Sequence, residues 1–117
     1  MAWKIQGTTI TLTRGDSLPL QVGIKVNGEL YTPQEGDVVK FHLKRNAMDS
    51  KRSKYLDEKP LICKQIPIET MILEILPNDT KKLEFGEYVY DLEITFGANG
   101  RVYTFINNAR FILAPEV

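Results

Sequence analysis

The stretch "SLPLQVGIKVNGELY", from Ser17 to Tyr31, decides the fold because its apolar residues recur at every second position. Such alternation is typical of a β-strand with one face in a core and the other in water. The apolar positions are Leu18, Leu20, Val22, Ile24 and Val26. Asn27-Gly28 follows at once and predicts a tight hairpin turn, because both residues tolerate a positive φ. We therefore expect residues 29–32 to form a short return strand.

Arg14-Gly15-Asp16 lies between this strand and the alternating, β-branched segment "TTITLT". Gly15 is expected to supply a positive φ, and Asp16 to cap the turn through its own backbone. Arg14 has three candidate carboxylate partners, Asp16, Asp37 and Asp91, and the sequence selects none of them. The same tripeptide is an adhesion signal in integrin ligands, where it sits on a long exposed loop. A short connection between two strands favours a turn instead.

The period of two continues downstream and predicts strands in "DVVKFHLKR", "EYVYDLEITF" and the apolar runs "LICKQIPIE" and "TMILEILP". The tetrapeptide "GANG", residues 97–100, predicts a hairpin turn before the last strand. Asn107-Asn108 interrupts that strand and predicts a bulge or a bend. Residues 46–60 are polar and lack periodicity, so we expect a long loop there.

The segment "PNDTKKLEFG" carries the one convincing signal for helix. Asn78 or Asp79 can cap a single turn, Leu83 can pack inward, and Gly86 can end the turn. The sequence therefore predicts a short helical turn near Asn78–Leu83.

About seven to nine short strands separated by turns predict an all-β fold, an immunoglobulin-like antiparallel two-sheet β-sandwich. Within "EFGEYVY", Tyr88 has the position of a tyrosine corner, in which the hydroxyl donates to upstream backbone. Tyr90 stands where immunoglobulin domains carry their second cysteine, so the sandwich is expected to lack that disulfide. The residues expected to determine the fold are Arg14, Gly15, Asp16, Asn27, Gly28, Gly86 and Tyr88.

Length and composition predict one β-sandwich domain, residues 1–117. Fifteen basic and fifteen acidic side chains cancel, whereas proteins that bind phosphate backbones carry a basic excess, so no nucleic-acid partner is expected. No apolar run has membrane-spanning length or resembles a signal peptide, so no membrane partner is expected. Cys63 is the single cysteine, which excludes an intrachain disulfide and favours folding in a reducing cytosol.

The supply of catalytic side chains is thin. His42, the single histidine, is expected on the solvent face of a strand, and Cys63 is expected to be a small buried hydrophobe. A Cys–His nucleophile pair is the enzymatic alternative, but no flanking motif supports it. Glu87, Asp91 and Glu93 share the outer face of one strand, where a solvated or partner-facing row is favoured over a general acid–base pair. We expect no catalytic residue, no metal site, no cofactor and no small-molecule substrate.

The last strand carries apolar side chains on both of its faces. Tyr103 and Phe105 alternate with Val102, Thr104 and Ile106. One of these faces must be exposed or covered by another subunit, which indicates an apolar interface. We expect Tyr103 and Phe105 to lie in that interface. Unpaired edge strands are the other candidates, because a partner can extend them.

Two segments carry a resemblance to a known family. They are "ITLTRGDSLPLQVGIKVNGELYTPQEGDVVKFHLKR" and "LPNDTKKLEFGEYVYDLEI", the second followed by a Thr-bearing strand and a terminal "FILAPEV". Together they resemble small immunoglobulin-like domains from phages and prophages of Gram-positive bacteria, including the N-terminal domains of baseplate upper proteins of lactococcal-type siphophages. The resemblance extends from Ile10 to Val117. It implies a β-sandwich that attaches to other virion proteins without catalysis. Such domains lead into a longer protein, whereas this sequence stops at Val117.

Two functions are therefore expected from the sequence. The first is a non-catalytic phage or prophage structural or assembly protein that docks to other virion proteins of the tail or baseplate, and to itself as a homo-oligomer. Its location would be the virion, assembled in the cytoplasm of the bacterial host. The alternative is a carbohydrate- or cell-surface-binding sandwich, with exposed aromatic rings for stacking and Arg14-Gly15-Asp16 as an adhesive loop.

Overall fold

The computed structural model describes residues 3–45 and 61–115, which form ten strands and one short helix. The strands are β1 (Trp3–Gln6), β2 (Thr9–Thr13), β3 (Leu18–Gln21), β4 (Ile24–Val26), β5 (Glu29–Tyr31), β6 (Val38–Arg45), β7 (Ile62–Ile66), β8 (Ile72–Ile75), β9 (Gly86–Thr95) and β10 (Val102–Ala114), and the helix is α1 (Pro77–Thr80). The fold is all-β and sandwich-like, as the alternation predicts. The loop expected at residues 46–60 lies outside the described residues.

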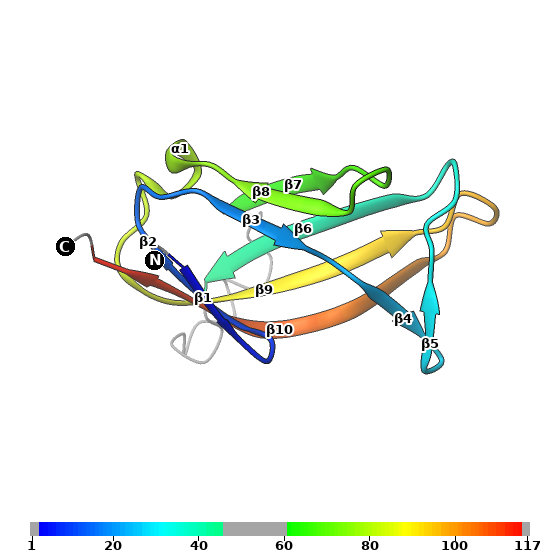
Figure 1. The fold of residues 1–117 in the computed structure, drawn as a ribbon, viewed down its shortest axis with the longest axis horizontal. Helices are drawn as coiled ribbons and strands as arrows, with labels where there is room; N and C mark the ends of the chain where they lie inside the picture. Colours follow the sequence, from blue (N-terminus) through cyan, green and yellow to red (C-terminus); the bar gives the residue numbers. More distant parts are fainter. Residues whose placement is uncertain (1–2, 46–60, 116–117) are drawn as a thin grey trace.

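One layer of the sandwich is a six-stranded sheet in the order β1-β2-β10-β9-β6-β7. The pair β3–β8 forms a second, narrower layer over it, and the β4–β5 hairpin projects at one end (Figure 1). Neighbouring strands of the large sheet are antiparallel except β2 and β10, which run parallel with Phe111 opposite Ile10. The expected antiparallel arrangement therefore holds throughout the large sheet except at this pair. The strand predicted from Leu18 to Val26 is interrupted at Val22-Gly23, which separates β3 from β4.

The core lies between the two layers and is built by the alternation seen in the sequence. On β6, for example, Val39, Phe41 and Leu43 are fully buried, whereas the residues between them are half-buried on the outer face. The largest side chains with essentially no exposure come from both layers: Ile10, Leu12, Leu18, Ile24, Phe41, Leu43, Ile66, Leu73, Ile75, Leu92, Ile94 and Phe111. Burial of this apolar surface is the main force that holds the layers together.

The two turns that flank β3 and β4 have the geometry that their residues predict. Gly15 has φ 88°, and the Asp16 backbone N–H donates to the Thr13 carbonyl oxygen at 3.1 Å, which closes the turn after β2. Asn27 and Gly28 have φ of 53° and 81° and form the two-residue connection between β4 and β5. Both positions therefore use the left-handed region that glycine and asparagine tolerate.

Arg14 ties the turn after β2 to the segment before β9. Its guanidinium donates to the Leu83 carbonyl oxygen at 3.4 Å and lies 4.3 Å from the centre of the Phe85 ring. The Gly15 N–H also reaches across, to the buried Thr80 hydroxyl at 3.2 Å. The contacts with the Leu83 carbonyl and the Phe85 ring join segments about seventy residues apart in the sequence, so they depend on the folded chain.

The predicted helical turn is present as α1, which begins one residue earlier than expected, at Pro77. Asp79 caps it from inside the first turn: its carboxylate accepts the Leu76 backbone N–H at 2.7 Å. Gly86 does not end this helix, which is a correction. The helix ends at Thr80, and Gly86, with φ 141°, begins β9.

The tyrosine pair at the start of β9 fixes two connections by hydrogen bonds. The Tyr88 hydroxyl donates to the Glu84 carbonyl oxygen at 2.6 Å, the contact that a tyrosine corner requires. Tyr90 is buried, and its hydroxyl donates to the Thr8 carbonyl oxygen in the β1–β2 turn. Its ring packs against Phe41 and Phe111 in the core. Tyr90 thus links β9 to the β1–β2 hairpin.

Alkaline unfolding is expected to report on Tyr90. Burial raises the pKa of Tyr90 to about 12, above the value near 10 of an unfolded tyrosine. The folded state therefore prefers the neutral phenol, and this contribution to stability is complete below pH ~10 and is lost as the pH rises towards ~12. In urea unfolding followed across that range, wild-type protein should lose stability more steeply than Tyr90→Phe. Tyr103→Phe, an exposed tyrosine, is the matched control and should follow the wild type. Parallel curves for Tyr90→Phe and wild type would contradict the assignment.

Asp37 closes the end of the sandwich opposite Arg14. Its carboxylate accepts the Tyr31 hydroxyl at 2.5 Å and the backbone N–H groups of Gln34 and Gly97, each at 2.8 Å. These hydrogen bonds, the one from Tyr31 first, lower the pKa of Asp37 below its usual value. The bond to Gly97 joins the β5–β6 turn to the β9–β10 turn. Asp37 is therefore a structural carboxylate at the other end of the sandwich from Arg14, for which it was one of three candidate partners.

Candidate functional site

Tyr103 and Phe105 lie on β10 near the end that Asp37 closes. Tyr103 is opposite the fully buried Ile94, so its side chain is on the core side of the sheet, yet 38% of it is exposed. Phe105 is half-buried against the core. The strand register shifts between Thr104 and Ile106, and both Phe105 and Ile106 pack against the core. The expectation that Phe105 and Ile106 face opposite sides of the strand is wrong, because the bulge breaks the alternation.

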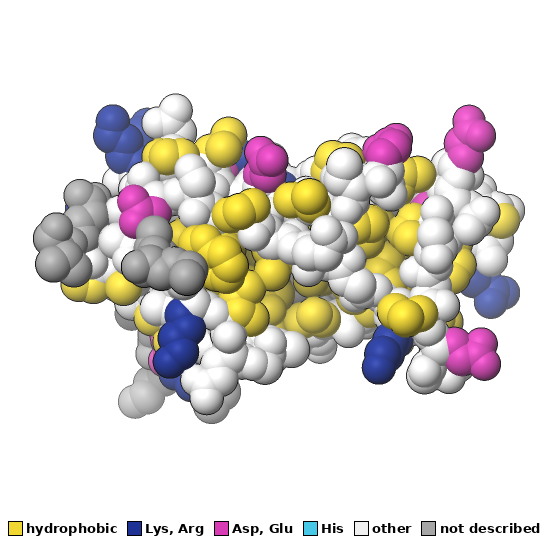
Figure 2. All heavy atoms as spheres, in the orientation of Figure 1, with side chains coloured by type: hydrophobic (Ala, Val, Ile, Leu, Met, Phe, Trp, Pro, Cys, Tyr) yellow, Lys and Arg dark blue, Asp and Glu magenta, His cyan; other side chains and the backbone are white. Residues whose placement is uncertain are grey.

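These residues belong to a band of incompletely covered apolar side chains that we call the apolar strip. It comprises Trp3, Ile5, Leu20, Val26, Tyr103, Phe105 and Ile106, from β1, β3, β4 and β10. The strip exists because the β3–β8 layer is narrower than the sheet below it. Hydrophobic side chains form a band along this side of the molecule (Figure 2). Ile5, Leu20 and Ile106 also line a hollow of about 190 Å³ between the β1–β2 hairpin and β3.

The free edge of β3, beside the apolar strip, is unsuited to pairing with another strand. The Val22 N–H donates to the Met71 carbonyl oxygen at 2.8 Å, and the β3–β8 register alternates from there. The backbone groups of Pro19 and Gln21 therefore face away from β8. Because Pro19 has no N–H, this edge cannot donate a regular ladder of hydrogen bonds. A partner strand therefore cannot extend the β3–β8 pair at this edge with a regular ladder of hydrogen bonds.

The outer face of the six-stranded sheet carries charged side chains that pair with one another. Lys44 contacts Asp91 at 2.5 Å, and Arg110 pairs with Glu87. Asp91 also accepts the Asn108 backbone N–H at 2.8 Å. The row of carboxylates predicted on this face is present, and two of its members are engaged by cations. Each of these two carboxylates, Glu87 and Asp91, holds an ion pair between neighbouring strands.

The bulge predicted at Asn107-Asn108 is present in β10. The register shifts between Ile106 and Ala109, and Asn108 has φ 52°. The N–H of Asn108 is turned out of the ladder and is satisfied by the Asp91 carboxylate. Asp91 therefore holds the second irregularity of β10, between Ile106 and Ala109.

Cys63 is exposed, and the expectation that it is buried is wrong. Strand β7 is an edge strand on which Ile62 and Ile66 face the core, so Cys63 faces outward. His42 lies between Cys63 and Asp91 on three adjacent strands, directly opposite each in the register. Among the described residues, however, no hydrogen bond joins His42 to either, and Asp91 is occupied by Lys44 and Asn108. Cys63 and His42 therefore lack the hydrogen bond between nucleophile and base that covalent catalysis uses.

Leu30 is an exposed residue that the sequence pattern did not single out. It projects from the β4–β5 hairpin with 78% of its side chain exposed, the largest value among the exposed large hydrophobic residues described. In "ELY" one of two neighbouring apolar residues must face outward, because successive strand residues point to opposite sides. Tyr31 faces the core, where its ring meets Phe96 edge-on at 5.4 Å, and Leu30 is left in solvent. The two adjacent apolar residues, Leu30 and Tyr31, are the sequence feature that could have indicated an exposed hydrophobic side chain here.

Within residues 3–45 and 61–115, the structure holds no group of three or more His, Cys, Asp or Glu side chains suited to a metal ion. In the same residues no helix has the length and apolar character needed to cross a membrane. Comparison of the chain with protein-family models, with curated proteins and with solved structures found no match in any of the three.

Proposed function

We propose that this chain is a non-catalytic structural or assembly module of a phage or prophage particle, which docks to other virion proteins of the tail or baseplate. The observation that carries the proposal is the apolar strip, a set of incompletely covered apolar side chains beside the core, along one side of the sandwich. The two segments that resemble phage immunoglobulin-like domains support the same role. The particle would be assembled in the cytoplasm of the bacterial host.

The chemistry of the strip suits a protein partner. Its apolar side chains gain by removal from water, and Tyr103 adds a ring with a polar hydroxyl, the type of anchor that dominates many protein interfaces. The opposite face of the large sheet carries Lys44–Asp91 and Arg110–Glu87, whose charges are already paired within the molecule. The partner is therefore expected on the side of the strip rather than on the outer face.

The test compares two adjacent substitutions on β10. Tyr103→Asp places a charge in the strip, whereas Val102→Asp places the same charge on the other side of the strand, where Val102 is 59% exposed. Each variant, checked for folding by circular dichroism, is mixed with the purified tail and baseplate proteins of the source phage, and binding is measured by calorimetry. Tyr103→Asp should weaken binding about 30-fold, the effect of a hot-spot residue, and Val102→Asp should leave it unchanged.

Two results would overturn the proposal. One is wild-type protein that binds none of the tail or baseplate proteins and is absent, by mass spectrometry, from purified particles. The other is binding that Val102→Asp abolishes and Tyr103→Asp does not affect, since the partner would then occupy the outer face.

A carbohydrate- or cell-surface-binding role is the second candidate, and the exposed ring of Tyr103 favours it. Sugars stack on such rings, and a glycan array is the direct test. Binding of a glycan that Tyr103→Ala removes would support this role in place of the first, and an array without signal would exclude it for the sugars presented.

A further inference from the structure

The β4–β5 hairpin and the loop between β7 and β8 border a second, open hollow, which we call the hairpin hollow. Its apolar lining is Val22, Ile24, Leu30, Tyr31, Pro33, Ile68 and Met71, its polar lining includes Glu69 and Thr70, and its volume is about 320 Å³. Leu30, the most exposed of the large hydrophobic residues described, stands at the side of this hollow instead of filling it. A second molecule can cover such an exposed leucine and fill the apolar hollow beside it.

The occupant is indicated by the shape of the patch itself. A surface that carries a projecting side chain next to a hollow is complementary to a copy of itself turned by 180°, because each projection then faces the other copy's hollow. Such isologous contacts generate two-fold dimers, the commonest form of protein oligomer. Leu30 and Ile68 come from opposite sides of the hairpin hollow, the hairpin and the β7–β8 loop, so the rotation brings Leu30 of one copy onto Ile68 of the other.

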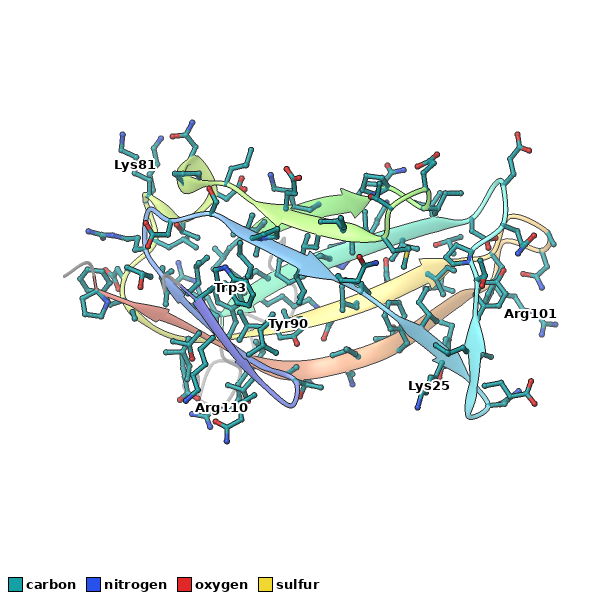
Figure 3. All side chains as sticks on the ribbon, in the orientation of Figure 1. Trp3, Lys25, Lys81, Tyr90, Arg101 and Arg110 are labelled. Carbon is teal, nitrogen blue, oxygen red and sulfur yellow. The ribbon has the colours of Figure 1, made fainter. Side chains whose placement is uncertain are left out.

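Charges at the two sides of the patch agree with this orientation. Lys25 is directly opposite Leu30 in the β4–β5 register, so both side chains are on the same side of the hairpin. Lys25 is exposed and points away from the two layers (Figure 3). Glu69, at the other side of the hairpin hollow, is also exposed. The rotation that brings Leu30 onto Ile68 brings Lys25 towards Glu69 of the second copy, twice in each dimer, so opposite charges meet.

We propose that two copies of this chain form a two-fold dimer through the hairpin hollow, with Leu30 of each copy inserted into the hollow of the other and Lys25 facing Glu69. This inference rests on the proposed role as an assembly module, for which it names one partner, the chain itself. The apolar strip lies outside the contact residues Leu30, Ile68 and Glu69 and is left for other virion proteins.

The first experiment measures oligomeric state by analytical ultracentrifugation over a wide range of protein concentrations. Wild-type protein should form a dimer, and Leu30→Ser should raise the dimer dissociation constant about 30-fold. Leu76→Ser is the matched control: Leu76 is also an exposed leucine, at 47%, but it precedes α1 and does not line the hairpin hollow. Serine is favoured at that helix-capping position, so this control should fold and should dimerise like the wild type.

The second experiment tests the orientation by charge exchange. Lys25→Glu and Glu69→Lys should each weaken the dimer, because each places like charges opposite one another. The double variant Lys25→Glu/Glu69→Lys should recover most of the affinity, since it restores the pair with the signs reversed. A double variant no better than the two single ones would overturn the orientation.

A wild-type protein that remains monomeric at all concentrations would overturn the dimer, and so would a dimer that Leu30→Ser leaves intact. Neither result bears on the apolar strip: a monomer that still binds tail or baseplate proteins, and loses that binding in Tyr103→Asp, would refute the dimer and leave the proposed function standing. The opposite outcome, a Leu30-dependent dimer that binds none of those proteins, would refute the proposed function alone.

Discussion

Phe111→Ala is expected to lower the free energy of unfolding by about 4 kcal/mol, the range in which phenylalanine truncations in protein cores fall. Phe111 has no exposed surface, and its ring lies 6.4 Å from that of Phe41 and 6.5 Å from that of Tyr90, measured between centroids. It also sits on β10 beside β2, at the parallel pair of the sheet. The substitution therefore leaves a cavity where three strands meet, and close-packed neighbours fill such a cavity poorly. Urea unfolding followed by circular dichroism measures the loss.

Phe85→Ala removes the same number of atoms from a phenylalanine that is 47% exposed and serves as its control. Phe85 contributes the ring beneath Arg14, so a loss below about 1 kcal/mol is expected, the value of an exposed cation–π contact. Equal losses in the two variants would show that Phe111 is not at the centre of the core.

Asp37→Ala is expected to destabilise the fold by about 3 kcal/mol, because it removes the carboxylate that accepts hydrogen bonds from three donors. The Tyr31 hydroxyl and the N–H groups of Gln34 and Gly97 all lose their partner. Asp37 is only 7% exposed, and the two turns that it joins approach closely: a Cβ atom added to Gly97 would lie 2.6 Å from the Gly36 carbonyl. Thermal and urea unfolding measure the effect. Glu35→Ala, in the same turn but exposed, should change stability by less than about 0.5 kcal/mol.

Acid unfolding gives Asp37 a second readout. The pKa of Asp37 is lowered in the folded state, so its ionised form contributes stability that is present above the unfolded pKa near 3.8 and is lost as the pH falls through the lower folded value. Wild-type protein should therefore lose stability in this acid range more steeply than Asp37→Asn, which has no charge to titrate. Identical acid profiles would mean that the carboxylate is protonated or unbound in the folded state.

Local signals in the sequence predicted the local structure well. Gly15, the Asn27-Gly28 pair and the Asn107-Asn108 bulge depend on backbone conformation, which each residue type largely sets by itself. The alternation on β6 and β9 likewise shows which residues share a face. It does not show where a strand lies in the sheet, and for this reason the exposure of Cys63 on the edge strand β7 was missed.

Contacts between segments distant in sequence set the rest of the structure. Arg14 meets Leu83 and Phe85, and Asp37 meets Gly97, a residue sixty positions away. The candidate surfaces depend on the same kind of information. The apolar strip exists because the β3–β8 layer is narrow, and Leu30 is exposed because Tyr31 is the neighbour that packs inward. The alternation of apolar residues predicts neither the width of a layer nor which of two neighbouring apolar residues packs inward.

The parallel pairing of β2 with β10 has a consequence for how the molecule is made. Strand β2 stays unpaired on one side until β10 has left the ribosome, because β10 lies between β2 and β9 and joins them. The large sheet is thus two separate pieces, the β1–β2 hairpin and the β9-β6-β7 group, until β10 has been synthesised. Contacts of such long range close late and slowly. The order of synthesis makes β10 the strand that joins the two parts of the large sheet, so cooperative stability depends on the arrival of β10.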